Sequence, residues 1–351
     1  MVKVLVLTRL FRGVPMGYGS EFEKQGCEIK TIISEVECSR WNFLYRVRKR
    51  LGLSNEKYMI RKDKMFAKLV CDTCESFSPD IIYVCHGTQL RADTVNLLKE
   101  KYYVVVDLID RLEFFPSLIN YVGHYHMVYS YIKADCEYLQ NKKINCKYLP
   151  AVGNPDVFFP IEIEKDIDIC FVGATYPEKF YGDRVQIINR LITDFPDCRI
   201  FVGGSCAPLR RPIKFVRWFF NRRYRTIYNN RDIDSVECNM IYNRSKICLN
   251  INRINTGEGW SERFGNIMFA GSFQIATYNK AIEETFGKMV ETFKSYEELR
   301  NKICHYLSNY QLLNEKAQDG HILYQQKVNE LREKLDVVSD VLDGYTKFKK
   351  V

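Results

Sequence analysis

Short apolar runs alternate with longer amphipathic stretches along most of the chain, and this alternation limits the fold more than any other feature. Several runs are apolar at successive positions, which is typical of strands buried on both faces of a parallel sheet, and the amphipathic stretches predict covering helices.

In the first half the expected strands are residues 3–8, 28–33, 80–85, 103–107, 127–129 and 146–149. In the second half they are residues 167–172, 199–202, 247–251, 273–276 and 289–292. From residue 295 the pattern is nearly all helical. The predicted class is α/β, with two doubly wound, Rossmann-like domains and C-terminal helices.

A proline-rich stretch separates the two halves. Residues 150–160 contain three prolines and one glycine, and a charged segment follows them. At 351 residues the chain is long enough for two domains of ordinary size. We predict a first domain at 1–150, a linker at 151–166, a second domain at 167–335 and a helical tail at 336–351. Two such domains usually bind a ligand in a cleft between them, at the carboxyl ends of the strands.

Charge and cysteine content restrict the partners and the compartment. The chain carries 52 basic and 43 acidic residues, a formal charge of +9, which favours an anionic partner such as a nucleotide, a membrane surface or a nucleic acid. Its 13 scattered cysteines are typical of free thiols in a reducing compartment, and Cys71 and Cys74 are expected to pack within a helix. No apolar run approaches the roughly 18 residues of a membrane span, and the N-terminus is unlike a signal peptide. We predict a cytoplasmic protein.

Polar residues follow two strands of the first domain. His86 comes directly after the third strand, where a near-neutral pKa would suit a general base, and a structural histidine is the alternative. Asp107 and Asp110 emerge from the buried fourth strand. Either carboxylate could take a proton from a hydroxyl, and an ion pair with Arg111 is the alternative.

A glycine-containing loop follows the first strand. Gly17 and Gly19 precede a helix that begins near Glu21. Glycines there would let backbone N–H groups approach a ligand at the start of the helix, and a purely structural turn is the alternative.

Two loops of the second domain indicate a ligand site more strongly than the loops of the first domain do. Gly173 follows the first strand and precedes a helix that starts near Arg184, an order that suits a bound phosphate. Gly203 follows the second strand on the same expected edge. Together the two loops indicate a nucleotide site more strongly than either does alone.

Residues 255–276 form the segment of the chain that is richest in candidate functional residues. Glycines and Ser261 precede a helix whose first turn contains Glu262 and Arg263. The helix is expected to end at Gly271, before another strand. A capped core helix without a ligand is the alternative.

Residues 255–276 resemble the donor-binding helix of GT-B glycosyltransferases, in particular the CgeB-like group and the glycosyl transferases group 1 family. Four further segments agree with that family: 147–160, 168–173, 242–250 and 293–299. The resemblance covers roughly residues 145–335 well and the N-terminal half loosely. It implies the GT-B fold, a nucleotide-sugar donor on the second domain and an acceptor on the first, with no obligatory metal or other cofactor.

The resemblance also assigns residues. It implies that Arg263 contacts the donor diphosphate. In related retaining enzymes two glutamates occupy the positions of Glu258 and Asn266, and the second contacts the ribose; here that position holds an amide. The implied donor-binding set is Gly173, Arg184, Gly203, Glu258, Glu262, Arg263 and Asn266, and the implied acceptor-side loop contains Gly17 and Gly19.

No metal site is predicted. Asp166 and Asp168 have the DxD spacing of metal-dependent sugar transferases, but they open a strand directly after the linker. We expect both side chains to be solvated.

Two basic segments could bind an anionic partner. Residues 209–225 interleave seven basic residues with four Phe or Trp, which suits a membrane surface bearing a lipid-linked acceptor. A nucleic acid and an ordinary solvated surface are the alternatives. Residues 46–50, with Arg61, Lys62 and Lys64, form a second basic cluster in the first domain.

These features predict a glycosyltransferase that moves a sugar from a nucleotide-sugar donor to an acceptor hydroxyl. The expected acceptor is a cell-surface glycan or a lipid-linked intermediate, reached from the cytoplasm or from the cytoplasmic face of the membrane. Asp107, Asp110 or His86 would act as a base only if the enzyme inverts the anomeric centre. The alternatives are a glycosyltransferase that acts on modified bases of nucleic acid and a non-catalytic nucleotide- or sugar-binding protein.

Overall fold

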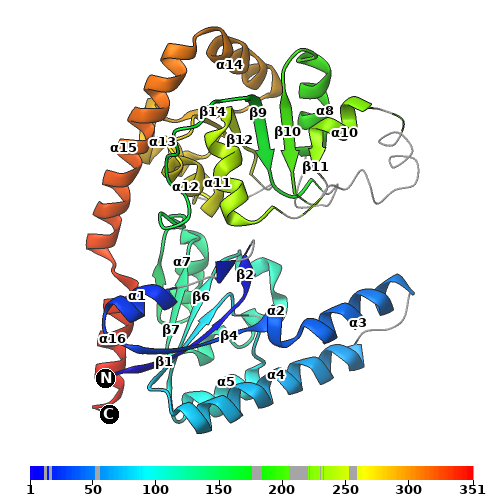
Figure 1. The fold of residues 1–351 in the computed structure, drawn as a ribbon. Coiled ribbons are helices and arrows are strands. Elements are labelled where there is room, and N and C mark those ends of the chain that lie inside the picture. The colour runs from blue at the N-terminus through cyan, green and yellow to red at the C-terminus, as the bar shows by residue number, and fades with distance from the viewer. Residues whose placement is uncertain are drawn as a thin grey trace. The chain divides into compact units, whose positions relative to one another are not determined.

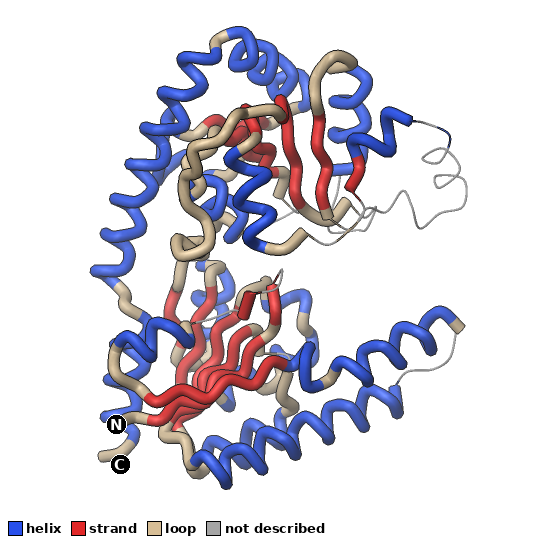
Figure 2. The backbone as a smooth tube through the Cα atoms, in the orientation of Figure 1, coloured by secondary structure: helices blue, strands red, loops and turns tan. Residues whose placement is uncertain are grey.

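The computed structural model describes residues 1–350 apart from 12–13, 16–17, 52–55, 88, 176–183, 205–219, 221, 230, 232 and 253–258. The chain divides into two compact units: Met1–Pro150 with Arg332–Val351 (unit 1), and Ala151–Leu331 (unit 2). Each unit is built around a six-stranded parallel sheet with helices on both faces (Figures 1 and 2). The predicted α/β class with two Rossmann-like domains is confirmed.

The unit 1 sheet has the strand order β4-β1-β5-β6-β7-β8. Its strands are β1 (Lys3–Thr8), β4 (Glu28–Ile33), β5 (Ile81–Cys85), β6 (Tyr103–Leu108), β7 (Met127–Ser130) and β8 (Cys146–Tyr148). The central strands β5, β6 and β7 are buried at every position, as their unbroken apolar runs predict. A separate antiparallel pair, β2 (Leu10–Phe11) and β3 (Val14–Pro15), follows β1.

Helices of unit 1 cover both faces of the sheet. They are α1 (Gly19–Lys24), α2 (Ser34–Glu37), α3 (Ser39–Arg50), α4 (Glu56–Phe77), α5 (Ala92–Lys99), α6 (Pro116–Ile119), α7 (Lys133–Asn141) and α16 (Val337–Phe348), with 3-10 turns η1 (Leu112–Phe114) and η2 (Val122–His124). One core joins α4, α5 and α7 to one face, and a second core joins α1 and α16 to the other. Cys74 of α4 is buried in the first core, where burial foremost raises the pKa of its thiol to about 12, which confirms the predicted packed thiol.

The C-terminal helix α16 is part of the unit 1 core. The sequence pattern alone sets residues 336–351 apart as a tail, but Val337, Val338 and Val341 are buried against the sheet. Asp340 accepts a hydrogen bond of 2.6 Å from the Tyr129 hydroxyl. Without α16, the apolar residues on this face of the sheet would lose their cover.

The unit 2 sheet has the strand order β11-β10-β9-β12-β13-β14. Its strands are β9 (Ile167–Val172), β10 (Ile200–Gly203), β11 (Tyr228–Asn229), β12 (Ser245–Asn250), β13 (Gln274–Thr277) and β14 (Glu291–Phe293). Five of them correspond to predicted strands within about two residues at each end. The edge strand β11 was not predicted, because two residues are too few to show a periodic pattern.

Helices also cover both faces of the unit 2 sheet. They are α8 (Arg184–Asp194), α10 (Arg222–Ile227), α11 (Ser235–Asn243), α12 (Glu262–Phe269), α13 (Lys280–Phe286), α14 (Tyr296–Ser308) and α15 (Tyr310–Lys334), with the 3-10 turn η4 (Gly287–Met289). One core contains residues of α8 and α14, and the other contains residues of α11, α12 and α15. Gly271 follows α12 with φ +64°, which confirms the predicted helix end. Across the described parts of both units, no helix is both long and apolar enough to cross a membrane.

Candidate functional site

The strand order of unit 2 reverses beside β9. The chain runs from β9 outward to β10 and β11, and then continues on the other side of β9 with β12, β13 and β14. The carboxyl ends of β9 and β12 therefore flank a topological switch point, the usual ligand-binding position of an open α/β sheet. Gly173 follows β9 and Ile251 follows β12. Arg184 and Arg263 both reach this point.

Arg263 lies in the first turn of α12 and contacts the ends of both strands. Its Nη1 donates a hydrogen bond of 3.3 Å to the carbonyl oxygen of Ile251. Its guanidinium lies over the ring of Phe171, 5.2 Å from the ring centre. A guanidinium held over an aromatic ring can keep N–H donors free for an anion. The sequence did not single out Phe171 or Ile251, because both look like ordinary strand residues.

Arg184 contacts the same two partners, the Ile251 carbonyl and the Phe171 ring. It is the first residue of α8 and only 4% exposed. Its Nε donates to the Ile251 carbonyl at 2.8 Å, its Nη1 donates to the Ala174 carbonyl at 3.2 Å, and its guanidinium lies 5.6 Å from the Phe171 ring centre. Arg184 therefore ties the loop after β9 to the loop after β12, and it brings a second positive charge to the switch point.

Close backbone packing at this point depends on glycine. A Cβ on Gly173 would stand 2.6 Å from Nη2 of Arg263. A Cβ on Gly204 would stand 2.9 Å from the carbonyl oxygen of Gly173, and Gly204 has φ +104°. The predicted residue Gly203 ends β10, and its carbonyl accepts a 2.9 Å hydrogen bond from the Gly173 N–H. The three glycines let the loops after β9 and β10 approach each other and Arg263.

Asn266 is buried, and its side chain holds the segment that enters unit 2. Its Oδ1 accepts a 3.0 Å hydrogen bond from the N–H of Asn154 and lies next to Gly153, which has φ +69°. In the described structure the amide therefore has a backbone partner, and its contact with a ribose stays a prediction. Glu262 begins α12 and is partly exposed, whereas Glu258 lies outside the described residues.

Several buried polar atoms near the strand ends have no hydrogen-bond partner among the described residues. They include the hydroxyl of Thr175, Oδ1 of Asn250, Oδ1 of Asn252 and the hydroxyl of Ser261. Thr175 is 1% exposed and Asn252 is 8% exposed, and they follow β9 and β12. Proteins pair nearly all such groups, so each of these atoms is expected to have a partner beyond the described residues, such as neighbouring chain, an ordered water or a ligand. Thr175 and Asn252 were missed in the sequence, although polar residues directly after buried strands were the available signal.

The unit 1 sheet has its own switch point, between β1 and β5, and His86 lies there. His86 is 7% exposed and has φ +86°, a backbone conformation that non-glycine residues rarely adopt and that is often found at functional sites. Nη1 of Arg9 donates to Nε2 of His86 at 3.4 Å. Because a guanidinium can only donate, Nε2 is the acceptor in this contact. The sequence did not single out Arg9 as a partner of this histidine.

Asp107 lies on the strand next to His86. It is 8% exposed in β6, and its carbonyl accepts a 2.7 Å hydrogen bond from the His86 N–H. Its Oδ2 accepts a 3.1 Å hydrogen bond from the Tyr83 hydroxyl. Burial foremost, and then the charge of Asp107, raise the pKa of Tyr83 well above its ordinary value, so Tyr83 stays a neutral donor. Asp110 lies two residues beyond β6 and is partly exposed.

The remaining predicted residues are less well placed. Gly19 begins the short helix α1, where a Cβ would meet no atom within 4 Å. Gly17 lies outside the described residues, as do residues 205–219 and 221 of the loop that contains the basic aromatic stretch.

Both aspartates with DxD spacing form ion pairs; Asp166 is partly exposed, as expected, whereas the Asp168 side chain is largely shielded from solvent. Asp166 forms a two-pronged ion pair with Arg244. Asp168 pairs with Lys246 at 2.7 Å and accepts a 2.7 Å hydrogen bond from the Arg199 N–H. Neighbouring strands place these partners opposite the start of β9, which the sequence could not show. Among the side chains that the structure describes, no group of three or more His, Cys, Asp or Glu could hold a metal ion.

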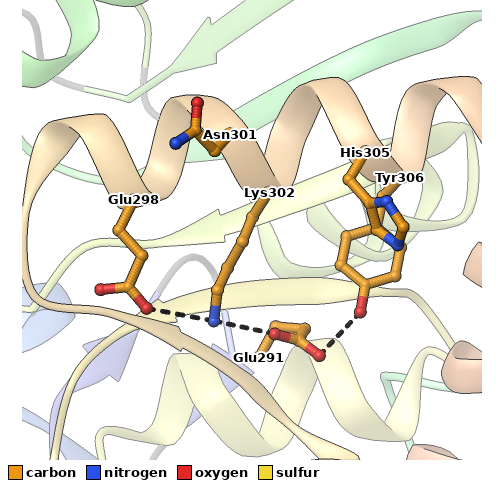
Figure 3. Close-up of a pocket in the computed structure, with 6 residues that line it drawn as sticks. All are labelled: Glu291, Glu298, Asn301, Lys302, His305 and Tyr306. Carbon is orange, nitrogen blue, oxygen red and sulfur yellow. Dashed lines mark hydrogen bonds and ion pairs between the residues drawn. The ribbon is translucent and has the colours of Figure 1, made fainter.

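A surface pocket of about 560 Å³ lies at the other edge of the unit 2 sheet (Figure 3). Its lining residues are Glu291, Glu298, Asn301, Lys302, His305 and Tyr306. Glu291 is the first residue of β14, so it lies at the amino-terminal edge of the parallel sheet. Its carboxylate accepts from Lys302 at 2.9 Å and from Tyr306 at 2.7 Å, and from Lys316 at 2.6 Å. Because these groups satisfy one another, we interpret the pocket as a structural ion-pair cluster.

Glu291→Gln is expected to destabilise unit 2 in a pH-dependent way. Burial acts to raise the pKa of Glu291, but hydrogen bonds from two lysines and a tyrosine outweigh it and lower the pKa to about 2, from an ordinary value of 4.5. The stabilising effect is therefore complete above pH 4.5 and is lost as the pH falls toward 2. The difference in pKa corresponds to about 3 kcal/mol.

Urea unfolding at neutral and acidic pH would measure this effect. Glu284→Gln is the matched control, because Glu284 forms an exposed ion pair with Lys280 in the same unit and should change stability by less than about 0.5 kcal/mol. If Glu291→Gln lost no more stability than the control at pH 7, the cluster would not stabilise the fold.

Comparison with known proteins agrees with this architecture. Residues 184–332 match the family described as glycosyl transferase-like. No curated protein sequence matches the chain. Sucrose-phosphate synthase from Thermosynechococcus elongatus is similar in structure, with 10% identity, a TM-score of 0.63 and coverage of 93% of this chain and 94% of that one.

Two further solved structures are similar over nearly their full lengths. Anabaena HepE in complex with UDP and glucose has 12% identity and a TM-score of 0.61, and the match covers 98% of this chain and 100% of that one. A trehalose-6-phosphate protein from E. coli bound with UDP-2-fluoro glucose has 11% identity and a TM-score of 0.58, with coverage of 99% and 98%. At these identities the structures establish the fold alone. The chain therefore has the two-domain GT-B fold, and residues 184–332, which lie almost entirely in unit 2, match the glycosyl transferase-like family.

Proposed function

We propose that the chain transfers a sugar from a nucleotide-sugar donor, with uridine diphosphate as the leaving group, to a hydroxyl of a glycan or lipid-linked acceptor. Unit 2 would bind the donor and unit 1 the acceptor. The observation that carries the proposal is the pair of guanidiniums at the β9–β12 switch point, where Arg184 and Arg263 share the Phe171 ring and the Ile251 carbonyl. The solved complexes of HepE with UDP and glucose and of the E. coli protein with UDP-2-fluoro glucose support uridine as the base.

The donor diphosphate would lie between Arg263 and the loops that contain Gly173 and Gly203. There the first turn of α12 offers backbone N–H groups and the positive end of the helix dipole. Arg184 is enclosed by backbone carbonyls, so its proposed role is to hold the two loops in place and to add positive charge.

Other donor contacts would come from polar groups near the same edge. The Thr175 hydroxyl is proposed to donate a hydrogen bond to the sugar or the nucleoside or to accept one from it, and Oδ1 of Asn252 is proposed to accept one. We keep Glu258 and Glu262 as proposed donor contacts. Asn266 is proposed to act through Asn154, by fixing the entry segment of unit 2, in addition to the ribose contact that the family resemblance implies.

In the proposed reaction the acceptor oxygen forms a bond to the anomeric carbon while the bond from that carbon to the diphosphate oxygen breaks. Negative charge develops on the leaving diphosphate, where Arg263 and the α12 N-terminus would stabilise it, so no metal is required. The proton of the acceptor hydroxyl would pass to Asp107 or Asp110 in an inverting mechanism. His86 is a weaker candidate, because Nε2 already accepts from Arg9.

The proposed setting is the cytoplasm or the cytoplasmic face of a membrane. The described cysteines are all free thiols, which suits a reducing compartment. The basic aromatic residues at 209–225 would contact an anionic membrane that carries the acceptor.

Nucleotide-dependent stabilisation tests the donor site. We expect UDP, at about 100 times its Kd, to raise the unfolding temperature by about 5 °C or more, because a ligand that binds only the native state stabilises it by about 2.7 kcal/mol at that concentration. The measurement is a thermal-shift series with UDP, GDP, ADP, CMP and dTDP, with and without EDTA. A shift with UDP that survives EDTA supports a metal-independent uridine site. If no nucleotide raised the unfolding temperature, the proposed donor site would be wrong.

A further inference from the structure

Helix α3 of unit 1 exposes a row of large apolar side chains. Phe43 is 59% exposed, Leu44 40%, Val47 37% and Leu51 67%. The N–H of Leu51 donates to the Val47 carbonyl at 3.1 Å, so the helical spacing continues to residue 51. At about 100° per residue these four positions fall within roughly one third of the helix circumference. We call them the α3 apolar stripe.

The stripe is exposed because another side of α3 makes the packing contacts. Trp41 packs against Tyr58 of α4, with ring centres 5.1 Å apart, and the Tyr58 hydroxyl donates to the Trp41 carbonyl at 2.8 Å. The later part of α4 enters the unit 1 core through Phe66 and Val70. Figure 1 shows α3 and the first half of α4 side by side, extending past the sheet of unit 1. The hairpin therefore holds the stripe on the outside of the unit.

The charge of α3 accompanies this apolar surface. The helix contains five basic residues, at 40, 46 and 48–50, and no acidic residue. In helical register, positions 46 and 50 border the stripe on one side and position 48 borders it on the other, while position 40 falls within its arc about one turn before Phe43 and Leu44. The first half of α4 also contains Arg61, Lys62 and Lys64, together with the acidic Glu56 and Asp63. An amphipathic helix with apolar side chains on one face and Lys or Arg at its borders is suited to the surface of an anionic membrane.

The same features disfavour other occupants. A second copy of the chain would bring two α3 helices, each with five positive charges, against each other. A nucleic acid would pair with the basic residues, but it would leave most of the stripe exposed to water, since only Phe43 among the four has a ring on which a base could stack. An anionic bilayer accommodates both the charges and the apolar side chains.

We infer that the α3 apolar stripe and the basic residues around it dock unit 1 on an anionic lipid surface. The side chains of the stripe enter the boundary between headgroups and acyl chains, while the basic residues contact lipid phosphates. This surface is separate from the nucleotide-sugar site of unit 2 and does not depend on it.

Vesicle sedimentation of the full chain tests the inference. We expect the protein to sediment with phosphatidylcholine vesicles that contain about 30% phosphatidylglycerol, and to bind pure phosphatidylcholine at least about tenfold more weakly. Binding should weaken severalfold when salt rises from about 50 to 500 mM, because the electrostatic part is screened. Phe43→Ser with Leu51→Ser should lower the partition coefficient about tenfold or more. Arg40→Gln should lower it about fivefold.

Leu97→Ser is the matched control, since Leu97 is 54% exposed on α5 of the same unit and should leave vesicle binding unchanged. Three results would overturn the inference: no binding to anionic vesicles, equal binding to neutral ones, or a double variant that binds like the control. If the native chain did not bind vesicles and the double variant still bound short single-stranded DNA, the basic residues would be assigned to nucleic acid. If light scattering showed a dimer of the native chain and the double variant were a monomer, the stripe would be assigned to a second copy.

Circular dichroism and the UDP-induced thermal shift serve as folding checks for each variant. A chain that keeps the UDP shift but does not bind vesicles would refute the membrane surface alone. A chain that binds vesicles without any nucleotide shift would refute the proposed donor site alone.

Discussion

Arg263→Ala is expected to weaken UDP binding by about 30- to 150-fold, because charge-assisted hydrogen bonds to a phosphate contribute about 2 to 3 kcal/mol. The rate of sugar transfer should fall by about 10²- to 10³-fold, since the same guanidinium would meet the charge that develops on the leaving group. The guanidinium is held on the Phe171 ring and bonded to the Ile251 carbonyl, so it is already positioned before the donor arrives. Isothermal titration with UDP measures the first effect and release of UDP from UDP-sugars measures the second.

Arg263→Lys separates the charge of this residue from its geometry. The lysine keeps the charge but loses the planar guanidinium fork, so we expect this variant to recover only part of the UDP affinity. Arg190→Gln is the matched control, because Arg190 pairs with Glu297 on the surface of the same unit and should leave UDP binding unchanged. Full UDP affinity in Arg263→Ala would show that the diphosphate binds elsewhere.

Gly204→Ala is expected to destabilise the fold by about 3 to 4 kcal/mol and to weaken UDP binding. Two costs add: alanine at φ +104° is strained by about 1 to 3 kcal/mol, and its Cβ would stand 2.9 Å from the carbonyl oxygen of Gly173. Gly173 cannot simply move away, because its N–H is bonded to the Gly203 carbonyl and its Cα lies against the Arg263 guanidinium. The unfolding temperature should drop by about 8 to 12 °C.

Gly26→Ala isolates the cost of backbone strain. Gly26 has φ +79°, but a Cβ there would meet no atom within 4 Å, so we expect a loss of only about 1 kcal/mol. Thermal unfolding of both variants with and without UDP makes the comparison. If Gly204→Ala lost no more stability than Gly26→Ala and kept its UDP shift, the close packing of the two loops would not matter for the site.

The strands and their loops were predictable because the chemistry that defines them is local. The apolar runs of β5 and β6 are long enough to show burial on both faces, and Gly173, Arg263 and His86 were recognised as residues directly beyond strands or in the first turn of a helix. The helix α12 was predicted from its flanking Ser261 and Gly271, which mark its two ends.

Partners far apart in the sequence were not predictable. Arg184 and Arg263 share the ring of Phe171, which the local pattern presents as an ordinary strand residue. Asn266 bonds the backbone of Asn154, 112 residues earlier in the chain. Asp168 looks solvated in the sequence but pairs with Lys246 on the neighbouring strand. Each of these contacts depends on strand order, which the sequence of one strand does not contain.

The sequence by itself determined the α/β class, nearly all the strands and the loops that carry the candidate residues, because periodicity, glycine and helix ends act over a few residues. Only the tertiary structure decided that Arg184 is enclosed, that Arg263 stands at the β9–β12 switch point, and that α16 returns to cover the unit 1 sheet. The physical reason is that a side chain becomes buried or paired only when folding brings another surface against it. An apolar or charged residue could contact several different partners, and the strand order selects one of them.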